Sequence, residues 1–198
     1  MELLLNPLQN YIEKGGFVLI PILITSVFMW TFIFERILWF KKACKNDISV
    51  NEISEILSGS KTCPAKKGLN AFLVKKYLNK KTGIRKKDIK IIDQSLMEVQ
   101  KNLNSYIAAI SILAAVSPLF GLLGTVTGMI STFDVISFFG TGNPKAMASG
   151  ISQALITTQT GLLTAIPGMF MAVIISGKAK RAKDSLNEAA MIIKRSIK

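Results

Sequence analysis

The chain of 198 residues contains no histidine, only two cysteines and only 12 acidic residues. Without histidine, the familiar nucleophile–base pairs cannot be built, so we expect no enzymatic activity and no catalytic residue. Cys44 and Cys63 lie nineteen residues apart without a histidine partner, which is not the spacing of a zinc site. Gly177-Lys178 lacks both the preceding glycine and the following Ser or Thr of a phosphate-binding loop. We therefore expect no metal and no cofactor.

Charge is also absent from long parts of the chain. Three apolar runs occupy residues 16–34, 107–133 and 151–176, and the first two contain no charged residue. Each run exceeds the roughly 18 residues that mark a helix able to cross a bilayer. Together with a hydrophobic fraction of 49%, the runs predict an all-α integral membrane protein with three transmembrane helices.

Basic residues dominate the segments between and after these runs. Of the 25 Lys and Arg residues, sixteen fall in residues 36–101 and seven in residues 177–198. Because basic loops stay on the cytoplasmic side of a membrane, we predict an N-terminus on the outer side and a cytoplasmic C-terminus. Such an excess can also mark a nucleic-acid-binding surface. Topology already accounts for it, so we expect no nucleic-acid partner.

The helical period of apolar residues extends beyond the runs. Apolar positions in residues 89–110 keep helical spacing into the second run, which predicts one uninterrupted helix that projects into the cytoplasm. The expected segments are, in order, an amphipathic helix on the membrane surface (1–15), the first transmembrane helix (16–40), a cytoplasmic region with two short amphipathic helices (41–85), the long helix with the second span (86–139), an outer loop (140–150) and the third span with a helical cytoplasmic tail (151–198).

Small and hydroxyl-bearing residues recur every three or four positions in the second and third runs, which places them on one face of each helix. Helices in a bilayer associate through such faces, because close approach of the backbones gains dispersion contact. We therefore expect the second and third spans to pack against each other. The glycines assigned to this packing are Gly121, Gly124, Gly128 and Gly161.

Thr125 and Thr158 lie on these faces at similar depth, roughly 10–14 Å below the outer surface of the membrane. A threonine hydroxyl can bond the backbone of its own helix and serve structure alone. The alternative is a polar wall beside water or another polar chain, to which Gln153 would also contribute. Glu35 and Asp134 mark the inner end of the first helix and the outer end of the second, and we expect solvated or salt-bridged interfacial charges there.

Three stretches of the sequence combine these features in a distinctive order. They are Glu13-Lys14-Gly15-Gly16 with Pro21-Ile22-Leu23 and Glu35-Arg36; Pro118-Leu119-Phe120-Gly121-Leu122-Leu123-Gly124-Thr125-Val126 with Gly128 and Phe133; and Gly150-Ile151-Ser152-Gln153-Ala154-Leu155 with Thr158, Gly161-Leu162 and Ala165-Ile166-Pro167. In these stretches the chain resembles the MotA/TolQ/ExbB proton-channel family, and most closely its three-span ExbB and TolQ branch. With the predicted topology, the resemblance covers nearly the whole chain.

The resemblance implies a multi-pass protein of the bacterial inner membrane with a periplasmic N-terminus. It also implies a ring of identical subunits, a pentamer by expectation, around the single spans of a smaller partner, ExbD or TolR, that carries an Asp within the membrane. The resemblance further implies that a periplasm-crossing protein of the TonB or TolA type receives the mechanical work that this complex performs. Thr125 and Thr158 match the family's two pore-facing threonines. Many relatives have Glu where this chain has Gln153, so a proton-carrying role is not transferred to the amide, which does not titrate.

Protons that cross a membrane need a group that alternates between charged and neutral forms, and Thr and Gln do not titrate. We therefore expect the partner's Asp to face Thr125 and Thr158, with hydroxyl bonds favouring its ionised form and a dry wall raising its pKa. The expected function is a proton-channel or motor subunit that uses the proton motive force to drive a TonB-type protein for outer-membrane nutrient import. TolQ-type envelope maintenance, a passive membrane scaffold and a self-sufficient small-solute carrier are the alternatives.

Overall fold

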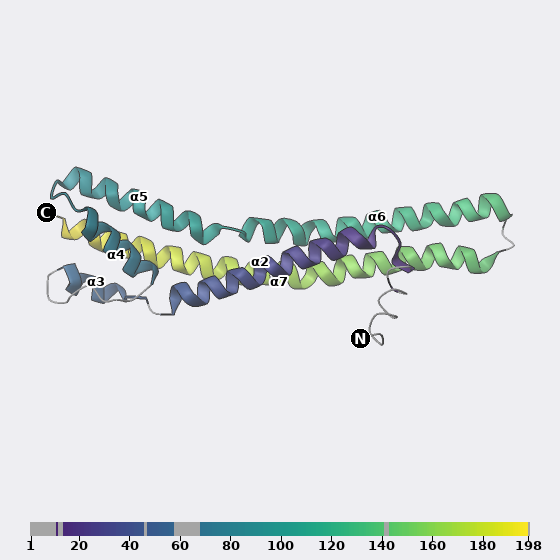
Figure 1. Cartoon of the computed structure of the whole chain (residues 1–198), viewed down its shortest axis with the longest axis horizontal. Helices are drawn as coiled ribbons and strands as arrows, with labels where there is room; N and C mark the ends of the chain where they lie inside the picture. The colour runs from purple at the N-terminus through teal and green to yellow at the C-terminus, as the bar shows by residue number, and fades with distance from the viewer. Residues whose placement is uncertain (1–10, 12–13, 46, 58–67, 141–142, 198) are drawn as a thin grey trace. The chain divides into compact units, whose positions relative to one another are not determined.

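The chain folds into α-helices throughout its described part. The computed structural model describes residues 11, 14–45, 47–57, 68–140 and 143–197, and within these residues no β-strand occurs. The helices are α2 (Leu19–Cys44), α3 (Val50–Leu57), α4 (Leu69–Lys80), α5 (Arg85–Asn104), α6 (Ile107–Phe139) and α7 (Pro144–Ser196), as Figure 1 shows. The helical stretches that contain α2, α6 and α7 are long and apolar enough to cross a membrane. The predicted all-α protein with three transmembrane helices is confirmed.

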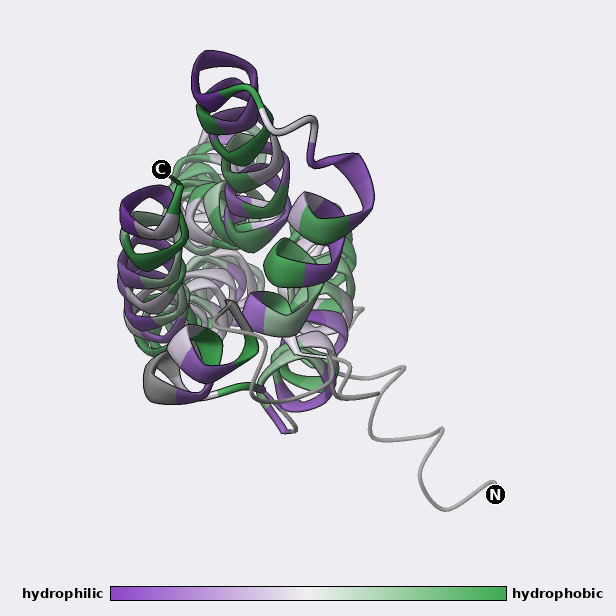
Figure 2. Ribbon diagram, turned by 90° about the vertical axis from the view of Figure 1, so that its left-hand side faces the viewer, coloured by the Kyte–Doolittle hydropathy of each residue, from purple (hydrophilic) through white to green (hydrophobic). Residues whose placement is uncertain are grey.

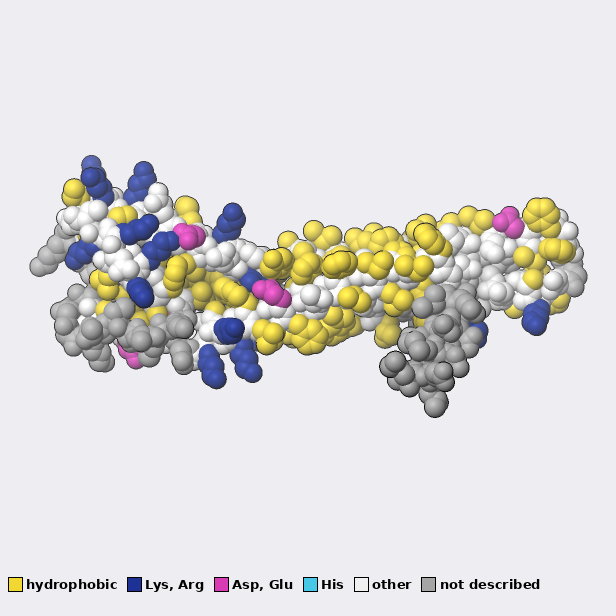
Figure 3. Space-filling view, viewed as in Figure 1, with side chains coloured by type: hydrophobic (Ala, Val, Ile, Leu, Met, Phe, Trp, Pro, Cys, Tyr) yellow, Lys and Arg dark blue, Asp and Glu magenta, His cyan; other side chains and the backbone are white. Residues whose placement is uncertain are grey.

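Residue contacts divide the chain into two compact units. Unit 1 comprises Met1–Ile33 and Ala109–Ala172, and unit 2 comprises Phe34–Ala108 and Val173–Lys198. Unit 1 therefore holds most of the uncharged sequence, whereas unit 2 holds most of the Lys and Arg residues. Figure 3 shows the same division, with dark blue side chains gathered over the helices of unit 2.

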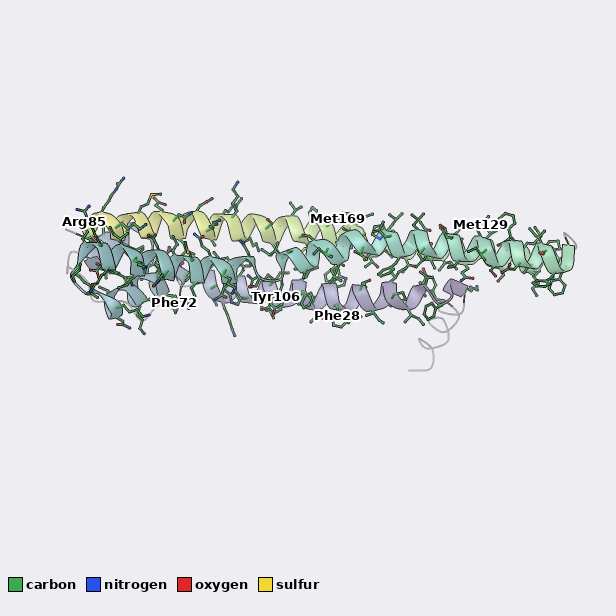
Figure 4. The ribbon with its side chains drawn as sticks, turned by 90° about the horizontal axis from the view of Figure 1, so that it is seen from above. Phe28, Phe72, Arg85, Tyr106, Met129 and Met169 are labelled. Atoms are coloured by element: carbon green, nitrogen blue, oxygen red, sulfur yellow. The ribbon has the colours of Figure 1, made fainter. Side chains whose placement is uncertain are left out.

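Unit 1 combines large apolar residues of α2 with small residues of α6 and α7. Ile22 and Met29 of α2 are fully buried. A β-carbon added at Gly168 of α7 would lie 2.3 Å from Sδ of Met29, so the glycine makes room for that side chain. On the outer faces, large apolar side chains such as Phe28 and Met129 are exposed (Figure 4). Such faces suit lipid chains or other membrane helices.

Unit 2 is held together by an apolar core with polar links at its margin. Leu73 of α4, Ile92 of α5 and Leu186 of α7 are fully buried. Figure 2 shows hydrophilic and hydrophobic residues on different sides of the helices nearest the viewer, which belong to this unit. Polar links join α5 to α7, from Gln100 Nε2 to Asn187 Oδ1 at 2.8 Å and from Lys194 Nζ to Asp93 Oδ1 at 2.6 Å.

The start of α4 is capped by a side chain from a distant part of the sequence. The residue preceding the helix, Gly68, has no side chain to cap it, and the carboxylate of Asp47 accepts hydrogen bonds from the backbone N–H groups of Asn70 and Ala71. A β-carbon at Gly68 would lie 2.2 Å from Oδ1 of Asp47. The glycine is therefore required for the carboxylate to reach the first turn of α4, where negative charge is favourable.

Removing this cap is expected to destabilise unit 2. Asp47→Ala leaves two N–H groups at the start of α4 without their acceptor, and we expect a loss of about 1 kcal/mol of unfolding free energy, as for other N-caps. Thermal unfolding of the purified chain in detergent measures the effect. Asp184→Ala, at an exposed position of α7, serves as the control with the same change of charge. Equal melting temperatures for the two variants would contradict the assignment.

Helix α7 begins earlier than the sequence analysis predicted. The expected outer loop at 140–150 is wrong, because the helix starts at Pro144. Asn143 caps it, since its Oδ1 accepts a hydrogen bond from Ala146 N at 3.1 Å. Asparagine at the cap followed by proline in the first helical position is a strong start signal. The first two turns of α7 therefore occupy residues for which the sequence analysis predicts a loop.

The uninterrupted helix expected over 86–139 is also wrong. The helix ends at Asn104 and resumes at Ile107, so that Ser105 and Tyr106 separate α5 from α6. Tyr106, labelled in Figure 4, has a φ of +61°, and it is the only non-glycine among the described residues with positive φ. A tyrosine rarely adopts this backbone region. Surrounding contacts must therefore stabilise the break.

Arg36 of α2 supplies such contacts. Its side chain is only 2% exposed and donates hydrogen bonds from Nη2 to the carbonyl oxygens of Asn102 and, at 2.6 Å, Leu103. These are carbonyls of the last turn of α5, where a cation is favourable. The guanidinium also lies 4.5 Å from the ring centre of Trp39. Arg36 therefore satisfies backbone groups that the break in the helix leaves without partners.

We expect Arg36→Met to be strongly destabilising. The substitution keeps much of the apolar stem but removes hydrogen bonds from a charged donor, each of which contributes about 1.5–3 kcal/mol. Arg36→Lys is expected to recover only part of the loss, because an ammonium cannot reproduce the planar fork. Thermal unfolding in detergent and protease cleavage near residue 105 measure the change. Arg85→Met, at an exposed position of α5, is the control, and a similar loss there would contradict the role of Arg36.

Most of the expected N-terminal amphipathic helix (1–15) lies outside the described residues. Tyr11 is described, and its hydroxyl is 3.0 Å from Oγ1 of Thr160 in α7. Gly16 then adopts a φ of +67°, which glycine accommodates without strain. α2 begins three residues later and ends at Cys44, so the first span starts and finishes later than the predicted 16–40.

Candidate functional site

The closest helix contact in unit 1 joins α6 to α7 through glycine. A β-carbon at Gly161 would lie 2.8 Å from the carbonyl oxygen of Ser117, and one at Gly121 would lie 3.1 Å from Cα of Thr158. In both cases the obstructing atom belongs to the backbone, which cannot move aside easily. The two helices therefore approach to a distance that only glycine permits.

The same contact continues toward the end of α6. A β-carbon at Gly128 would lie 2.7 Å from the carbonyl oxygen of Gly150, and one at Gly124 would lie 2.2 Å from Oγ1 of Thr157. The structure thus places Gly121, Gly124, Gly128 and Gly161 at the contact between α6 and α7. None of the described residues that obstruct these added β-carbons is charged.

The side chain of Thr157 occupies the space that a side chain at position 124 would need. The side chain is fully buried, and its hydroxyl is 3.0 Å from the carbonyl oxygens of both Gln153 and Ala154. Because its hydrogen-bonding partners lie within its own helix, the hydroxyl enters the contact without an unsatisfied polar atom. Thr157 is therefore a packing residue.

Thr158 and Thr125 differ from Thr157 because both remain half-buried in the single chain. The Thr158 hydroxyl lies 3.0 Å from the carbonyl oxygen of Ala154 in its own helix and 3.3 Å from that of Gly121 in α6. The Thr125 hydroxyl donates to the carbonyl oxygen of Leu122 at 2.7 Å. Both hydroxyl groups thus use their hydrogen on the backbone, and their oxygen lone pairs are left to accept hydrogen bonds.

Gln153 contacts the start of α2. A β-carbon at Gly16 would lie 2.0 Å from Nε2 of Gln153, so the amide group rests against the turn that precedes the first span. The side chain is half-buried. The sequence predicts that Gln153 faces a partner together with the two threonines, and within the single chain its amide lies against Gly16.

Glu35 and Asp134 lie at helix positions that are exposed. Asp134 is on the last part of α6, beyond the glycine contact, and Glu35 immediately precedes the buried Arg36 on α2. Neither carboxylate joins the hydroxyl groups of Thr125 and Thr158. The described residues also contain no group of acidic, cysteine or histidine side chains that could hold a metal ion.

Gly150 is a packing residue that the sequence analysis did not assign. A β-carbon there would lie 2.2 Å from Oγ1 of Thr132 and 2.8 Å from the carbonyl oxygen of Gly128. The spacing of Gly150, Ala154, Thr157 and Gly161 follows the same steps of three and four, so the signal was present. The loop predicted at 140–150 excludes Gly150, so the predicted face of small residues on α7 ends one helical turn too early.

Around the threonines, the outer surfaces of α6 and α7 are apolar. Leu119, Leu122 and Leu163 are between 60% and 71% exposed. No ionisable residue occurs at positions 107–133 or 151–176. The fold and the site therefore define a multi-pass membrane protein whose second and third spans form a close, uncharged contact and carry half-buried hydroxyl groups, among them those of Thr125 and Thr158.

Comparison with known sequences agrees with this class. Residues 65–188 match the MotA/TolQ/ExbB proton channel family, and the chain belongs to that family. The biopolymer transport protein ExbB of Salmonella typhimurium is 27% identical over 195 residues, which cover 87% of this chain and 77% of that protein. An ExbB-like protein of Helicobacter pylori is 26% identical over 180 residues, 88% of this chain and 90% of that protein.

A further relative matches a shorter stretch of this chain with higher sequence identity. The biopolymer transport protein exbB1 of Vibrio cholerae is 37% identical over 92 residues, which cover 46% of this chain and only 40% of that protein. The resemblance to the ExbB and TolQ branch noted in the sequence is confirmed by these relatives and by the family match.

Proposed function

We propose that this chain is a proton-channel subunit of an energy-transducing complex in the bacterial inner membrane, which drives a TonB-type protein for outer-membrane nutrient import. Membership in a proton channel family supports the proposal, as do relatives named biopolymer transport proteins. The observation that carries it is the pair of half-buried hydroxyl groups, Thr125 and Thr158, in spans without an ionisable residue.

A proton path through such spans needs an acid from another polypeptide. Thr and Gln do not exchange protons near neutral pH, and intramembrane carriers of charge are ionisable residues. In the proposed complex, a single-span partner of the ExbD or TolR type supplies an aspartate, and several copies of this chain, five by expectation, surround it. The N-terminus lies in the periplasm and the basic unit 2 in the cytoplasm, as the distribution of Lys and Arg favours.

The hydrogen bonds of the threonines predict which form of that acid they prefer. Both hydroxyl groups donate to backbone carbonyls, so they offer only lone pairs to a partner. A protonated carboxyl group can donate to a lone pair, whereas a carboxylate cannot. The threonines therefore stabilise the neutral form of the partner's aspartate. This differs from the expectation from sequence that the hydroxyl groups favour the ionised form.

Protonation then controls how the partner sits in the ring. The neutral aspartate binds the threonine surface of one subunit, and loss of the proton releases it toward water or the next subunit. A proton that moves down a membrane potential of about 150 mV releases roughly 3.5 kcal/mol, at 2.3 kcal/mol per 100 mV. That energy is sufficient to shift a two-state equilibrium by more than a factor of 100.

Reconstitution in vesicles tests the proposal. The chain is reconstituted alone and together with the single-span protein that co-purifies with it, and proton uptake is followed with a pH-sensitive dye under an imposed potential. We expect flux only from the assembled complex, and none after the partner's intramembrane Asp is changed to Asn. Equal flux from the chain alone would rule out a borrowed acid. Absence of flux together with intact assembly would favour a passive scaffold.

A further inference from the structure

Unit 2 contains an open groove of about 870 Å³ between the end of α2, the start of α4 and the middle of α7. Its volume is within the range of small-ligand sites. Ile37 and Phe40 of α2, Ile48, and Leu69 of α4 contribute apolar side chains to the lining. The remaining lining residues are Lys41, Cys44, Lys45, Asp47, Ser49, Asn70, Lys178, Arg181, Ala182 and Ser185.

The groove carries an excess of positive charge that the described residues do not neutralise. Lys41, Lys45, Lys178 and Arg181 line it, and none of the four forms an ion pair with another described residue. Asp47 is the only acid in the lining, and its carboxylate is occupied by the N–H groups at the start of α4. An anionic occupant would complement this charge.

The groove lies where two membrane helices leave the apolar part of the sequence. On α2, Trp39 and Phe40 are followed directly by Lys41 and Lys42, and on α7 the third apolar run ends two residues before Lys178. Aromatic and basic residues in this order mark the headgroup layer of a bilayer. Basic pockets between membrane helices at this level bind the headgroups of anionic lipids.

Other segments of this chain are poor occupants on grounds of charge. Residues 58–67 contain three Lys and no acid, and the whole chain has a net charge of +13. Either residues 58–67 or a second copy of the chain would add positive charge to a positive groove. A lipid combines the two properties that the lining requires, a negative headgroup and an apolar chain.

We propose that this groove binds an anionic phospholipid from the leaflet on the basic side of the membrane. The phosphate lies among Lys41, Lys45, Lys178 and Arg181, and the upper part of an acyl chain lies against Ile37 and Phe40. The site is distinct from the α6–α7 contact and does not depend on proton conduction. Its consequence is that the composition of the membrane influences how firmly the ends of α2 and α7 are joined.

Cys44 offers a direct reporter, because it lines the groove and its side chain is exposed. The full chain with Cys63→Ala is placed in nanodiscs of phosphatidylcholine alone or with phosphatidylglycerol, and the rate of maleimide labelling is measured. We expect phosphatidylglycerol to slow labelling of Cys44 at least fivefold. A reporter moved out of the groove, Lys180→Cys in a Cys44→Ala background, measures any general effect of the charged surface and is expected to change little.

Two charge variants separate the groove from the surface around it. Lys178→Gln with Arg181→Gln removes two groove cations and is expected to abolish the protection of Cys44. Lys180→Gln with Lys183→Gln removes the same charge from exposed positions of α7 outside the lining and is expected to retain it. Equal labelling in both lipid mixtures, or loss of protection in both variants, would overturn the proposal.

Retention of lipid by the purified protein gives an independent measurement. Native mass spectrometry is expected to show phosphatidylglycerol adducts on the wild type and to show fewer on Ala182→Phe, which fills the groove without changing charge. If the double charge variant fails to fold, Ala182→Phe decides the question. Inorganic phosphate and an acidic peptide are added in separate arms at millimolar concentration. Protection of Cys44 by either of them in phosphatidylcholine nanodiscs would show that the groove binds a soluble anion or an acidic protein partner rather than a lipid. That result would overturn the proposal.

Discussion

Replacing Thr158 with valine is expected to lower proton-driven transport by about tenfold while leaving the assembled complex intact. Valine has the same shape as threonine but lacks the oxygen that accepts from the partner's protonated aspartate. The loss of one such hydrogen bond corresponds to about 1–1.5 kcal/mol, and 1.4 kcal/mol is a factor of ten in an equilibrium constant. Proton flux and transport are measured on the same purified complex.

The pH profile separates this role from a structural one. If the Thr158 hydroxyl stabilises the neutral acid, its removal makes the neutral form less favourable, and the pH dependence of flux shifts to lower pH. A substitution that merely loosens the helices would reduce flux at every pH alike. Thr158→Ser, which keeps the oxygen, is expected to restore both flux and profile.

Thr164→Val provides the matched control for Thr158→Val. It lies on the same helix and is half-buried, but six residues at 100° each place it on a different face. We expect near-normal flux from this variant. An unaltered flux and pH profile in Thr158→Val would remove the threonine from the proton path.

Gly161→Ala is expected to separate α6 from α7. The new β-carbon would lie 2.8 Å from the carbonyl oxygen of Ser117 and 3.2 Å from Cα of Gly121, and both obstructing atoms belong to the backbone. Overpacking of a close contact costs typically 1–3 kcal/mol. We expect a lower melting temperature in detergent, together with a loss of flux, because Thr158 lies on the same contact.

Gly177→Ala is the matched control for Gly161→Ala. Both glycines are in α7, but a β-carbon at Gly177 would have no neighbouring atom within 4 Å. Alanine favours helix over glycine by about 1 kcal/mol, so Gly177→Ala is expected to raise stability slightly. The same substitution therefore acts in opposite directions at two positions of one helix. A similar effect at both would show that the α6–α7 contact is not as close as described.

Features that depend on composition over a whole helix could be predicted from the sequence. The three spans follow from long runs without charge, and the short helices α3 and α4 follow from their amphipathic spacing. The α6–α7 contact follows from small residues repeated at helical spacing. In each case the pattern is repeated over several turns, so one misread residue does not change the result.

Features that depend on a single distant contact could not be predicted. Residues 104–106 contain neither Gly nor Pro, and the apolar period continues through them. The break between α5 and α6 instead depends on Arg36, nearly seventy residues away in sequence. The contact of Gln153 with Gly16 is of the same kind. The start of α7 at Asn143-Pro144 is different, because its signal is local: asparagine at the cap followed by proline marks the beginning of a helix.

The interruption at Ser105 and Tyr106 also bears on how easily the backbone twists at this point of the chain. A continuous helix resists twisting because its backbone hydrogen bonds link each turn to the next, and that linkage ends between α5 and α6. The backbone is therefore easier to twist at Ser105 and Tyr106 than within α5, and the hydrogen bond from Arg36 to the carbonyl oxygen of Leu103 links α2 to the end of α5 beside this point.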